Sequence, residues 1–413
     1  MLTFDRFTLP NGLRFIVHHD PTTPVLAMNI LYDVGARDES EDQTGFAHLF
    51  EHLMFGGSVN IPKYDEPLQR AGGENNAFTN SDITNYYLTL PVQNVETAFW
   101  LESDRMLNLA FSEKSLEVQR QVVVEEFRQN YLNQPYGDIW LLLKPLAYKT
   151  HPYQWNTIGK EVSHIEQASL QDVRNFYARF YNPNNAIVTV AGNITTPEVK
   201  LLAGKWFGPI PAGPANVRKL PQEAVQLEKR SLVVDRDVPY TKIYKAWHMC
   251  ARPEEAYYTL DLISDLLGSG HSSRLYAELV RRQKLFSEIT AYVSGDNDPG
   301  LFVVSGKLNP NVDPFMAEEA INRVVMELST KKLHDTELRK VKNKVISTLA
   351  YENISLLNRA MNLTFSENLG DANLFNQLPG FYRKVNADKV FEQANEVFRE
   401  TNSNTLIYRA KNQ

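Results

Sequence analysis

The stretch at residues 44–57 constrains this chain more than any other. It reads Thr-Gly-Phe-Ala-His-Leu-Phe-Glu-His-Leu-Met-Phe-Gly-Gly, in which the first Thr-Gly pair can cap a short helix and the closing Gly-Gly pair can end it. Apolar side chains fall on nearly every side of that helix, and such a helix is normally buried. It also carries His48, Glu51 and His52. Burying three ionisable groups is unfavourable unless a partner compensates their lost hydration.

A metal ion would be such a partner. His48 and His52 are four residues apart, so they lie on one face of the helix, where both imidazoles can reach a single Zn²⁺. Glu51 lies beside them and can face a water molecule at the metal without being a ligand, as a general base must. The pattern His-x-x-Glu-His is the inverted form of the common zinc-protease motif. The alternative is a pair of buried structural histidines with a surface glutamate.

The composition fits a folded protein of more than one domain. A chain of 413 residues is long enough for two domains with their own cores. The formal net charge of −6 gives no reason to expect a nucleic acid or an anionic membrane as a partner. No run of about 18 apolar residues is present, so we expect no membrane span.

Compartment signals are few. The single cysteine, Cys250, excludes an internal disulfide bond and suits a reducing compartment. The N-terminus does not resemble a signal peptide. The sequence as written therefore indicates a cytoplasmic protein, and a leader removed before residue 1 would instead indicate the periplasm or an organelle.

The order of predicted elements recurs once along the chain. Each half has strands, a shorter helix, a long helical region and a closing strand. The predicted elements are, in the first half, strands at 13–17, 25–34, 86–90 and 186–191 and helices at 61–71, 92–109, 112–132, 138–148 and 170–180, and, in the second half, strands at 231–234, 242–247, 289–293, 301–307 and 405–408 and helices at 253–267, 314–330 and 335–363. This recurrence predicts two copies of one α+β unit of about 200 residues.

A segment rich in proline and glycine separates the two copies. Four prolines and two glycines fall within residues 208–221, a composition typical of a linker. We therefore divide the chain into an N-terminal domain at 1–208 that carries the histidine helix, a linker at 209–228, and a homologous C-terminal domain at 229–413 that has no metal motif.

Two histidines leave a catalytic zinc site one ligand short, because such sites usually have three protein ligands and a water. The predicted helix at 112–132 contains the adjacent residues Glu125 and Glu126. Adjacent residues on a helix point about 100° apart, so at most one of the two carboxylates can reach the metal. The residues alone leave open which one does, and also that both are solvated surface groups.

Several motifs together resemble the pitrilysin/insulinase family of zinc peptidases. They are Leu-Pro-Asn-Gly-Leu at 9–13, the His-x-x-Glu-His helix at 45–57, Gly-Gly-Glu-Asn-Asn-Ala-Phe-Thr at 72–79, and the segment from Asn-Pro-Asn-Asn to the glycine at 182–192. The chain is most similar to the branch that includes the mitochondrial processing peptidase subunits. The resemblance implies two homologous α+β domains, each an antiparallel-rich sheet with helices packed on it, that form half of a clamshell chamber.

The resemblance also implies a third ligand. In the family it is a glutamate in the pattern Arg-x-Val-x-x-x-Glu, which this chain has at 120–126, so Glu126 is the implied ligand, 74 residues after His52 (126 − 52). The implied site is one Zn²⁺ per chain held by His48, His52 and Glu126, with Glu51 as the catalytic general base. The N-terminal domain is then the zinc-bearing peptidase domain.

Two further residues are implied to bind substrate. Asn76 and Ala77 match family positions whose backbone binds the substrate as an added edge strand. Pairing through the main chain recognises an extended shape more than a side-chain sequence. Peptides and unfolded segments are therefore the expected substrates.

The second half departs from the family pattern at one position. Family members that complete the site from their second half carry an arginine and, seven residues later, a tyrosine. Arg281 matches the arginine, but the residue seven positions on is Glu288 (281 + 7), and a carboxylate would repel a developing oxyanion. We therefore expect a homologous partner subunit to supply a complete arginine and tyrosine pair in a heterodimer, with a homodimer as the alternative. His271 lies in a glycine-containing loop and is not expected to bind metal.

The leading interpretation is a zinc metalloendopeptidase that cleaves peptides or unfolded segments inside a chamber, as the catalytic subunit of a heterodimer. A second is a non-catalytic core or scaffold subunit of a processing or respiratory-type complex. The intact set of His48, Glu51, His52 and Glu126 argues against a scaffold, which needs no general base. A third is another zinc hydrolase such as an amidase.

Overall fold

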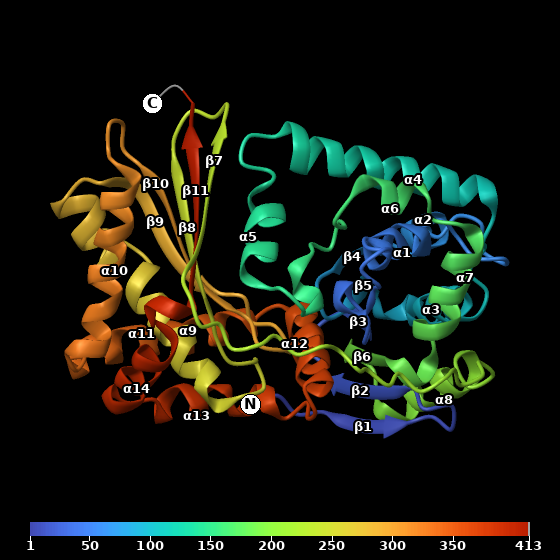
Figure 1. Ribbon diagram of the computed structural model, residues 1–413. Helices are drawn as coiled ribbons and strands as arrows, with labels where there is room; N and C mark the ends of the chain where they lie inside the picture. The colour runs from blue at the N-terminus through green and yellow to red at the C-terminus, as the bar shows by residue number, and fades with distance from the viewer. Residues whose placement is uncertain (412–413) are drawn as a thin grey trace. The chain divides into compact units, whose positions relative to one another are not determined.

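The computed structural model describes residues 1–411 and divides into two compact units. Unit 1 consists of residues 1–128, 155–220 and 351–377, and unit 2 of residues 129–154, 221–350 and 378–411. Each unit combines helices with a mixed β-sheet (Figure 1), which confirms the predicted α+β class. Of the helices within residues 1–411, none is long and apolar enough to cross a membrane.

Unit 1 is built on a six-stranded sheet with the order β1-β2-β6-β3-β5-β4. Only β2 and β6 run parallel, and every other neighbouring pair is antiparallel. Its elements are β1 Asp5–Thr8, β2 Arg14–His19, β3 Val25–Tyr32, β4 Glu74–Thr79, β5 Thr84–Pro91 and β6 Ala186–Gly192, with α1 Phe46–Met54, α2 Asp65–Arg70, α3 Val95–Leu107, α4 Glu113–Phe127, α6 Val162–Glu166, α7 Leu170–Phe180, α8 Thr196–Trp206 and α12 Leu356–Asn368.

Unit 2 is built on a five-stranded sheet with the order β7-β11-β8-β10-β9. Here β7 and β11 are the parallel pair, and the other pairs are antiparallel. Its elements are β7 Arg230–Arg236, β8 Lys242–His248, β9 Phe286–Val293, β10 Leu301–Leu308 and β11 Ser403–Ala410, with α5 Ile139–Ala147, α9 Glu255–Gly268, α10 Pro314–Thr330, α14 Ala387–Val397, most of α11 Asp335–Glu352 and most of α13 Leu374–Lys384.

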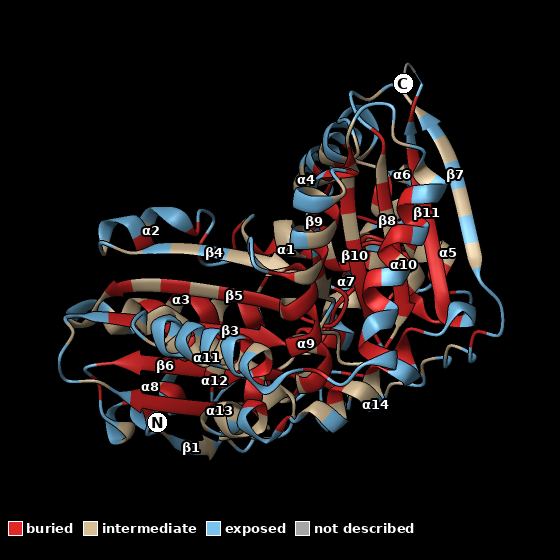
Figure 2. Ribbon diagram, turned by 90° about the vertical axis from the view of Figure 1, so that its left-hand side faces the viewer, coloured by how far each residue is buried: buried red, intermediate tan, exposed pale blue. Residues whose placement is uncertain are grey.

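The two sheets share one topology, which supports the predicted internal duplication. If β1 is set aside, the order β2-β6-β3-β5-β4 corresponds strand for strand to β7-β11-β8-β10-β9, including the single parallel pair. The strands come from strongly apolar segments: all seven residues of β6 are buried, and seven of the eight residues of β3 are. The edge strands β4 and β7 have no such buried run, as Figure 2 shows by their pale colours.

Each unit takes one helix from the other half of the sequence. Helix α12 packs on β2, β3 and β6 of unit 1, and α5 packs on β7, β8 and β11 of unit 2. The units therefore differ from contiguous domains at 1–208 and 229–413, because the apolar face of each sheet is covered by the segment from the other repeat. The boundary at 220–221 falls inside the expected linker, which has no regular element between α8 and β7.

The single long helix predicted at 335–363 is wrong. The structure has α11 up to Glu352 and α12 from Leu356, separated by a break at 353–355. The Ser355 hydroxyl accepts a hydrogen bond from the Asn358 N–H at 3.3 Å and so caps the start of α12. The break lets the chain pass from unit 2 into unit 1.

An ion pair fastens α12 to the sheet of unit 1. The Arg359 guanidinium donates a hydrogen bond to Asp20 Oδ2 at 2.7 Å, just beyond the end of β2. The Thr22 hydroxyl and N–H both donate to Asp20 Oδ1, at 2.6 and 3.0 Å. These hydrogen bonds, first from Thr22 and then from Arg359, hold the pKa of Asp20 well below its ordinary value.

We expect Asp20→Asn to lower the free energy of unfolding of unit 1 by about 1–3 kcal/mol at pH 7, because it removes charge-assisted hydrogen bonds. Since the folded pKa is lowered, the stabilisation is complete above the ordinary carboxyl pKa of 3.8 and is lost as the pH falls below it. Urea denaturation at pH 7 and pH 3 measures this difference. Asp42→Asn, at an exposed position, is the control, and equal loss in both variants at pH 7 would contradict the assignment.

Candidate metal centre

Helix α1 confirms the short buried helix predicted from the sequence. Its residues Phe46, Ala47, Leu49, Phe50, Leu53 and Met54 are buried. The ring of Phe50 packs against Tyr181 and Phe176, with ring centroids 4.7 and 5.1 Å apart. Gly45 precedes the helix with φ of +88°, and a Cβ there would lie 2.7 Å from the Ile158 carbonyl oxygen, so only glycine fits. Aromatic packing and this tight entry fix the direction of α1.

The N-terminus of α1 is capped by a residue that the sequence analysis missed. Both oxygens of Glu39, which is buried, accept backbone hydrogen bonds, from the N–H of Gly45 at 2.9 Å and of Ala47 at 2.8 Å. The expected Thr44 cap is not formed, because the Thr44 hydroxyl interacts with His164 and accepts from the Lys160 N–H. Burial raises the pKa of Glu39 to about 8, and the hydrogen bonds from the Ala47 and Gly45 N–H groups oppose this rise. Glu39 lies seven residues before Phe46, the first residue of α1, so the spacing of residues near the helix start does not reveal this cap.

The structure brings together the three residues assigned as metal ligands. His48 and His52 project from α1, and Glu126 projects from α4, which packs against α1. The Nε2 atoms of the two histidines are 3.3 Å apart, and Glu126 Oε2 lies 3.7 Å from His48 Nε2 and 3.5 Å from His52 Nε2. Within residues 1–411 this is the one cluster of histidine, cysteine or acidic side chains with metal-binding geometry.

The adjacent glutamate, Glu125, points elsewhere. Its carboxylate accepts a hydrogen bond from Arg128 at 2.7 Å and is 57% exposed. Because the two residues differ by about 100° around the helix, only Glu126 faces α1. The geometry therefore favours Glu126 over Glu125, in agreement with the sequence prediction.

The donor set fits zinc. Ligand atoms held tetrahedrally about 2.1 Å from one Zn²⁺ lie about 3.4 Å from one another, which matches the three separations above. Two imidazole nitrogens and one carboxylate oxygen are common zinc ligands and leave a fourth position open. The three side chains are 15%, 24% and 34% exposed, so a substrate can reach that position.

The electrostatics of the cluster also suit a cation. Burial lowers the pKa of His48 to about 4, so its ring is neutral at pH 7, as a metal ligand must be. A hydrogen bond with His52 lowers the pKa of Glu126, which keeps its carboxylate ionised. Burial raises the pKa of Glu51, and a hydrogen bond from Thr79 opposes this rise.

Glu51 lies on α1 between the two histidines but points to the edge strand β4. Its Oε2 accepts a hydrogen bond from the Thr79 hydroxyl at 2.6 Å. The side chain is therefore beside the cluster without joining it, as expected for a general base.

Asn76 and Ala77 lie in β4, which is an edge strand of the unit 1 sheet. Within residues 1–411, β4 pairs only with β5, so its outer edge is open. The Ala77 N–H donates a hydrogen bond to the neighbouring Asn76 Oδ1 at 2.8 Å. Because β4 also contacts α1, an added strand would run beside Glu51.

The residues singled out in the second half form no metal site. Arg281 is exposed at the end of a π-helical turn, Tyr276–Arg282. Glu288 lies in β9 with its carboxylate 3.7 Å from the Lys307 ammonium of the neighbouring strand. His271 is exposed and stacks on Tyr276, with ring centroids 4.6 Å apart.

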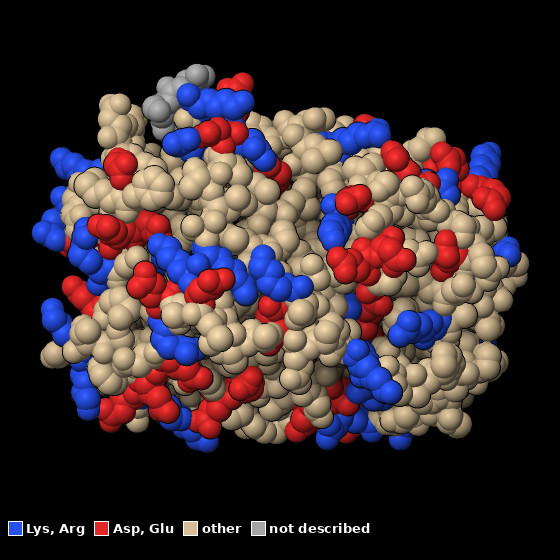
Figure 3. Space-filling model, viewed as in Figure 1, with Lys and Arg blue, Asp and Glu red and all other residues tan. Residues whose placement is uncertain are grey.

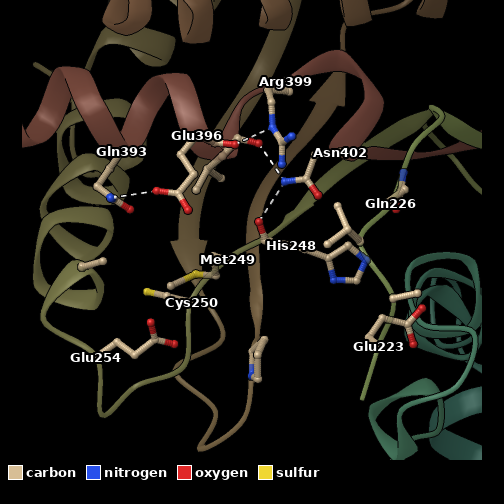
Figure 4. A pocket seen from close by; sticks show the side chains of 15 residues that line it. Glu223, Gln226, His248, Met249, Cys250, Glu254, Gln393, Glu396, Arg399 and Asn402 are labelled. Carbon is tan, nitrogen blue, oxygen red and sulfur yellow. Dashed lines mark hydrogen bonds between the residues drawn. The ribbon is translucent and has the colours of Figure 1, made fainter. Parts of the chain in front are cut away.

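A second site of interest is a pocket of about 380 Å³ in unit 2, whose lining includes His248, Cys250 and three glutamates (Figure 4). One wall carries His248 and Cys250. Burial raises the pKa of the Cys250 thiol to about 12, so this thiol is protonated and is no nucleophile at neutral pH. A ring nitrogen of His248 is 3.1 Å from the Ala147 carbonyl oxygen. All of the lining residues belong to unit 2, whereas the cluster with metal-binding geometry lies in unit 1.

Acidic and basic side chains are interspersed over the face shown in Figure 3, with no broad basic area. This distribution agrees with the net charge of −6.

The fold and the His-x-x-Glu-His cluster define a two-repeat α+β protein of the inverted zincin class. The family model described as "Insulinase (Peptidase family M16)" matches residues 14–154, and the model described as "Peptidase M16 inactive domain" matches residues 167–345. The chain is 31% identical to the zinc protease PqqE of Helicobacter pylori over 341 residues, which covers 81% of this chain and 77% of that protein. The chain belongs to the insulinase family, peptidase family M16.

Other relatives agree with this assignment. An uncharacterized zinc protease, YmxG of Bacillus subtilis, is 24% identical over 97% of each chain. The crystal structure of a protease from Helicobacter pylori superposes with a TM-score of 0.92 at 28% identity and covers 99% of this chain and 100% of its own. Pitrilysin shares the fold, with a TM-score of 0.80 at 18% identity, and this chain spans 45% of its length.

We expect purified protein to contain about one zinc per chain by elemental analysis, and His52→Ala to lose most of it, because two remaining ligands bind zinc weakly. A chelator should lower the melting temperature of the wild type and leave that of His52→Ala unchanged, since only the former has metal to lose. His271→Ala is the matched histidine control and should retain its zinc. Full zinc content in His52→Ala would refute the ligand assignment.

Proposed function

We propose that this protein is a zinc metalloendopeptidase that cleaves peptides or unfolded segments. One observation carries the proposal: His48, His52 and Glu126 converge with zinc-like spacing, and Glu51 lies on the same helix as the two histidines. A scaffold subunit has no need for a general base at a metal cluster. The names of the relatives in two bacteria, both zinc proteases, support the same reaction class.

The residues divide the work of peptide hydrolysis. His48, His52 and Glu126 would hold the zinc, which when bound supplies Lewis acidity to a water molecule and to the scissile carbonyl. Glu51 accepts a proton from the attacking water and then returns it to the leaving amine. The water oxygen becomes part of the new carboxyl group, and the C–N bond breaks.

The open edge of β4 supports a peptide as the substrate. A segment added there in extended form would pair with the main chain around Asn76 and Ala77 and pass next to Glu51. Small amides have no strand to pair, so an amidase would gain nothing from this edge. Extended peptides should therefore be cleaved in preference to small amides.

We expect Glu51→Gln to reduce cleavage of an internally quenched peptide by about 10²- to 10⁴-fold, the usual contribution of a general acid–base group. Zinc content should stay at the wild-type level, because Glu51 is not a ligand. Glu125→Gln is the matched control on α4 and should retain activity, since the Glu125 side chain is exposed and accepts its hydrogen bond from Arg128. Equal activity in wild type and Glu51→Gln would favour the scaffold function.

We further propose that the active form includes a homologous partner subunit. Glu288 stands where the family pattern has a tyrosine, and its pairing with Lys307 leaves it no oxyanion-stabilising role. The chain spans about half the length of pitrilysin, which is consistent with two such chains doing together what one longer chain does alone. A partner with an intact arginine and tyrosine pair would complete the site.

The partner proposal is tested by comparing two preparations of the protein. We expect chain produced alone in a foreign host to bind zinc but to cleave peptide about 10²-fold more slowly than the assembly isolated from its own cell, since one group that stabilises the oxyanion is missing. Light scattering gives the subunit mass of each preparation. A homodimer with full activity when purified alone would overturn the heterodimer proposal.

A further inference from the structure

The hydroxyl of Thr79 forms a direct link between the edge strand β4 and the carboxylate of Glu51. Its Oγ1 donates to Glu51 Oε2 at 2.6 Å, a short bond of the kind made to a charged acceptor. Among residues 1–411, no other hydrogen bond to the Glu51 side chain is found, so Oε1 stays free. The two oxygens of Glu51 are thus in different environments.

Thr79 itself is firmly placed. It is the last residue of β4 and pairs with Thr84, which is buried and donates its hydroxyl to the Val34 carbonyl at 3.0 Å. The turn that follows is tied to the segment before α1, where the Arg37 N–H donates to the Ser81 carbonyl at 2.8 Å. A β-branched side chain on such a backbone has few χ1 rotamers, so the hydroxyl direction is restricted.

We propose that Thr79 is a positioning residue that anchors Glu51 Oε2 and so leaves Oε1 as the oxygen that takes and returns the proton. Without this hydroxyl the Glu51 side chain gains rotational freedom, and fewer of its conformers are competent for proton transfer. The inference rests on the proposed peptidase function and adds to it a residue outside the metal ligands and the general base.

The position of Thr79 also connects substrate binding with catalysis. It lies in the same strand as Asn76 and Ala77. Because Thr79 is two residues beyond Ala77, the side chains of Thr79 and Ala77 lie on the same face of the sheet. A peptide that pairs with β4 would be held by the strand that also holds Glu51. The reacting carbonyl and the general base would then share one rigid support.

Steady-state kinetics on a quenched peptide test this role, with the protein isolated from its own cell so that any partner is retained. Thr79→Val keeps the β-branched shape and removes the hydroxyl, and we expect kcat to fall about 10- to 100-fold with KM within about twofold and zinc unchanged. Thr79→Ser keeps the hydroxyl and should recover kcat to within about threefold of the wild type.

Thr89→Val is the matched control. Thr89 lies in β5, and its hydroxyl donates to the Glu74 carboxylate in β4 at 3.2 Å, so a threonine–glutamate hydrogen bond that involves β4 is lost while the contact to Glu51 stays. Its kinetics should equal those of the wild type.

The outcomes separate the two proposals. An active wild type with an unchanged kcat in Thr79→Val overturns the role of Thr79 alone. Equal losses in Thr79→Ser and Thr79→Val, or loss of zinc from either, would show a structural role and overturn it as well. The peptidase function, and with it the positioning role, is overturned if the wild type has no activity. It is also overturned if the wild type stays active with a chelator and the Glu51→Gln variant is as active as the wild type.

Discussion

The buried helix α1 carries ionisable side chains whose lost hydration must be compensated, and the arrangement of the elements around it in unit 1 depends on this constraint. Apolar side chains bury this helix, and each histidine or glutamate it carries loses hydration as a result. The structure meets this cost by grouping His48 and His52 with Glu126 of α4 and by giving Glu51 a hydroxyl partner in Thr79. Burial that keeps His48 neutral also prepares it to bind a cation. Stability and chemistry therefore depend on the same contacts.

Three elements far apart in sequence have to meet for this arrangement to exist. Helix α1 brings the histidines, α4 brings Glu126, and β4 brings Thr79 and an open strand edge. Glu39 holds the start of α1, and the aromatic ring of Phe50 holds its middle. Contacts from several elements therefore restrain the side chains of the cluster.

Local patterns predicted most elements and singled out His48, Glu51 and His52, whereas Glu126 was implied only by the family resemblance. Helical and strand periodicity depend on near neighbours, so the helix at 170–180 and the strand at 186–191 were found almost residue for residue. The failures had long-range causes. Three features were missed: the helix break at 353–355, the packing of α5 and α12 on the sheet of the other repeat, and the Glu39 cap. Each depends on contacts between elements that are distant in sequence, and local residue spacing does not encode such contacts.

The sequence by itself determined the family and the kinds of side chain at the candidate site: a buried helix carries two histidines one turn apart with a glutamate between them, and the family motifs implied the third ligand. Only the tertiary structure showed by direct geometry that Glu126, and not Glu125, faces α1. It also showed the hydrogen bond between Thr79 and Glu51, and the packing of α5 and α12 on the sheet of the other repeat. The physical reason is that ligand type and helical spacing are properties of neighbouring residues, whereas convergence of side chains from separate elements depends on how those elements pack.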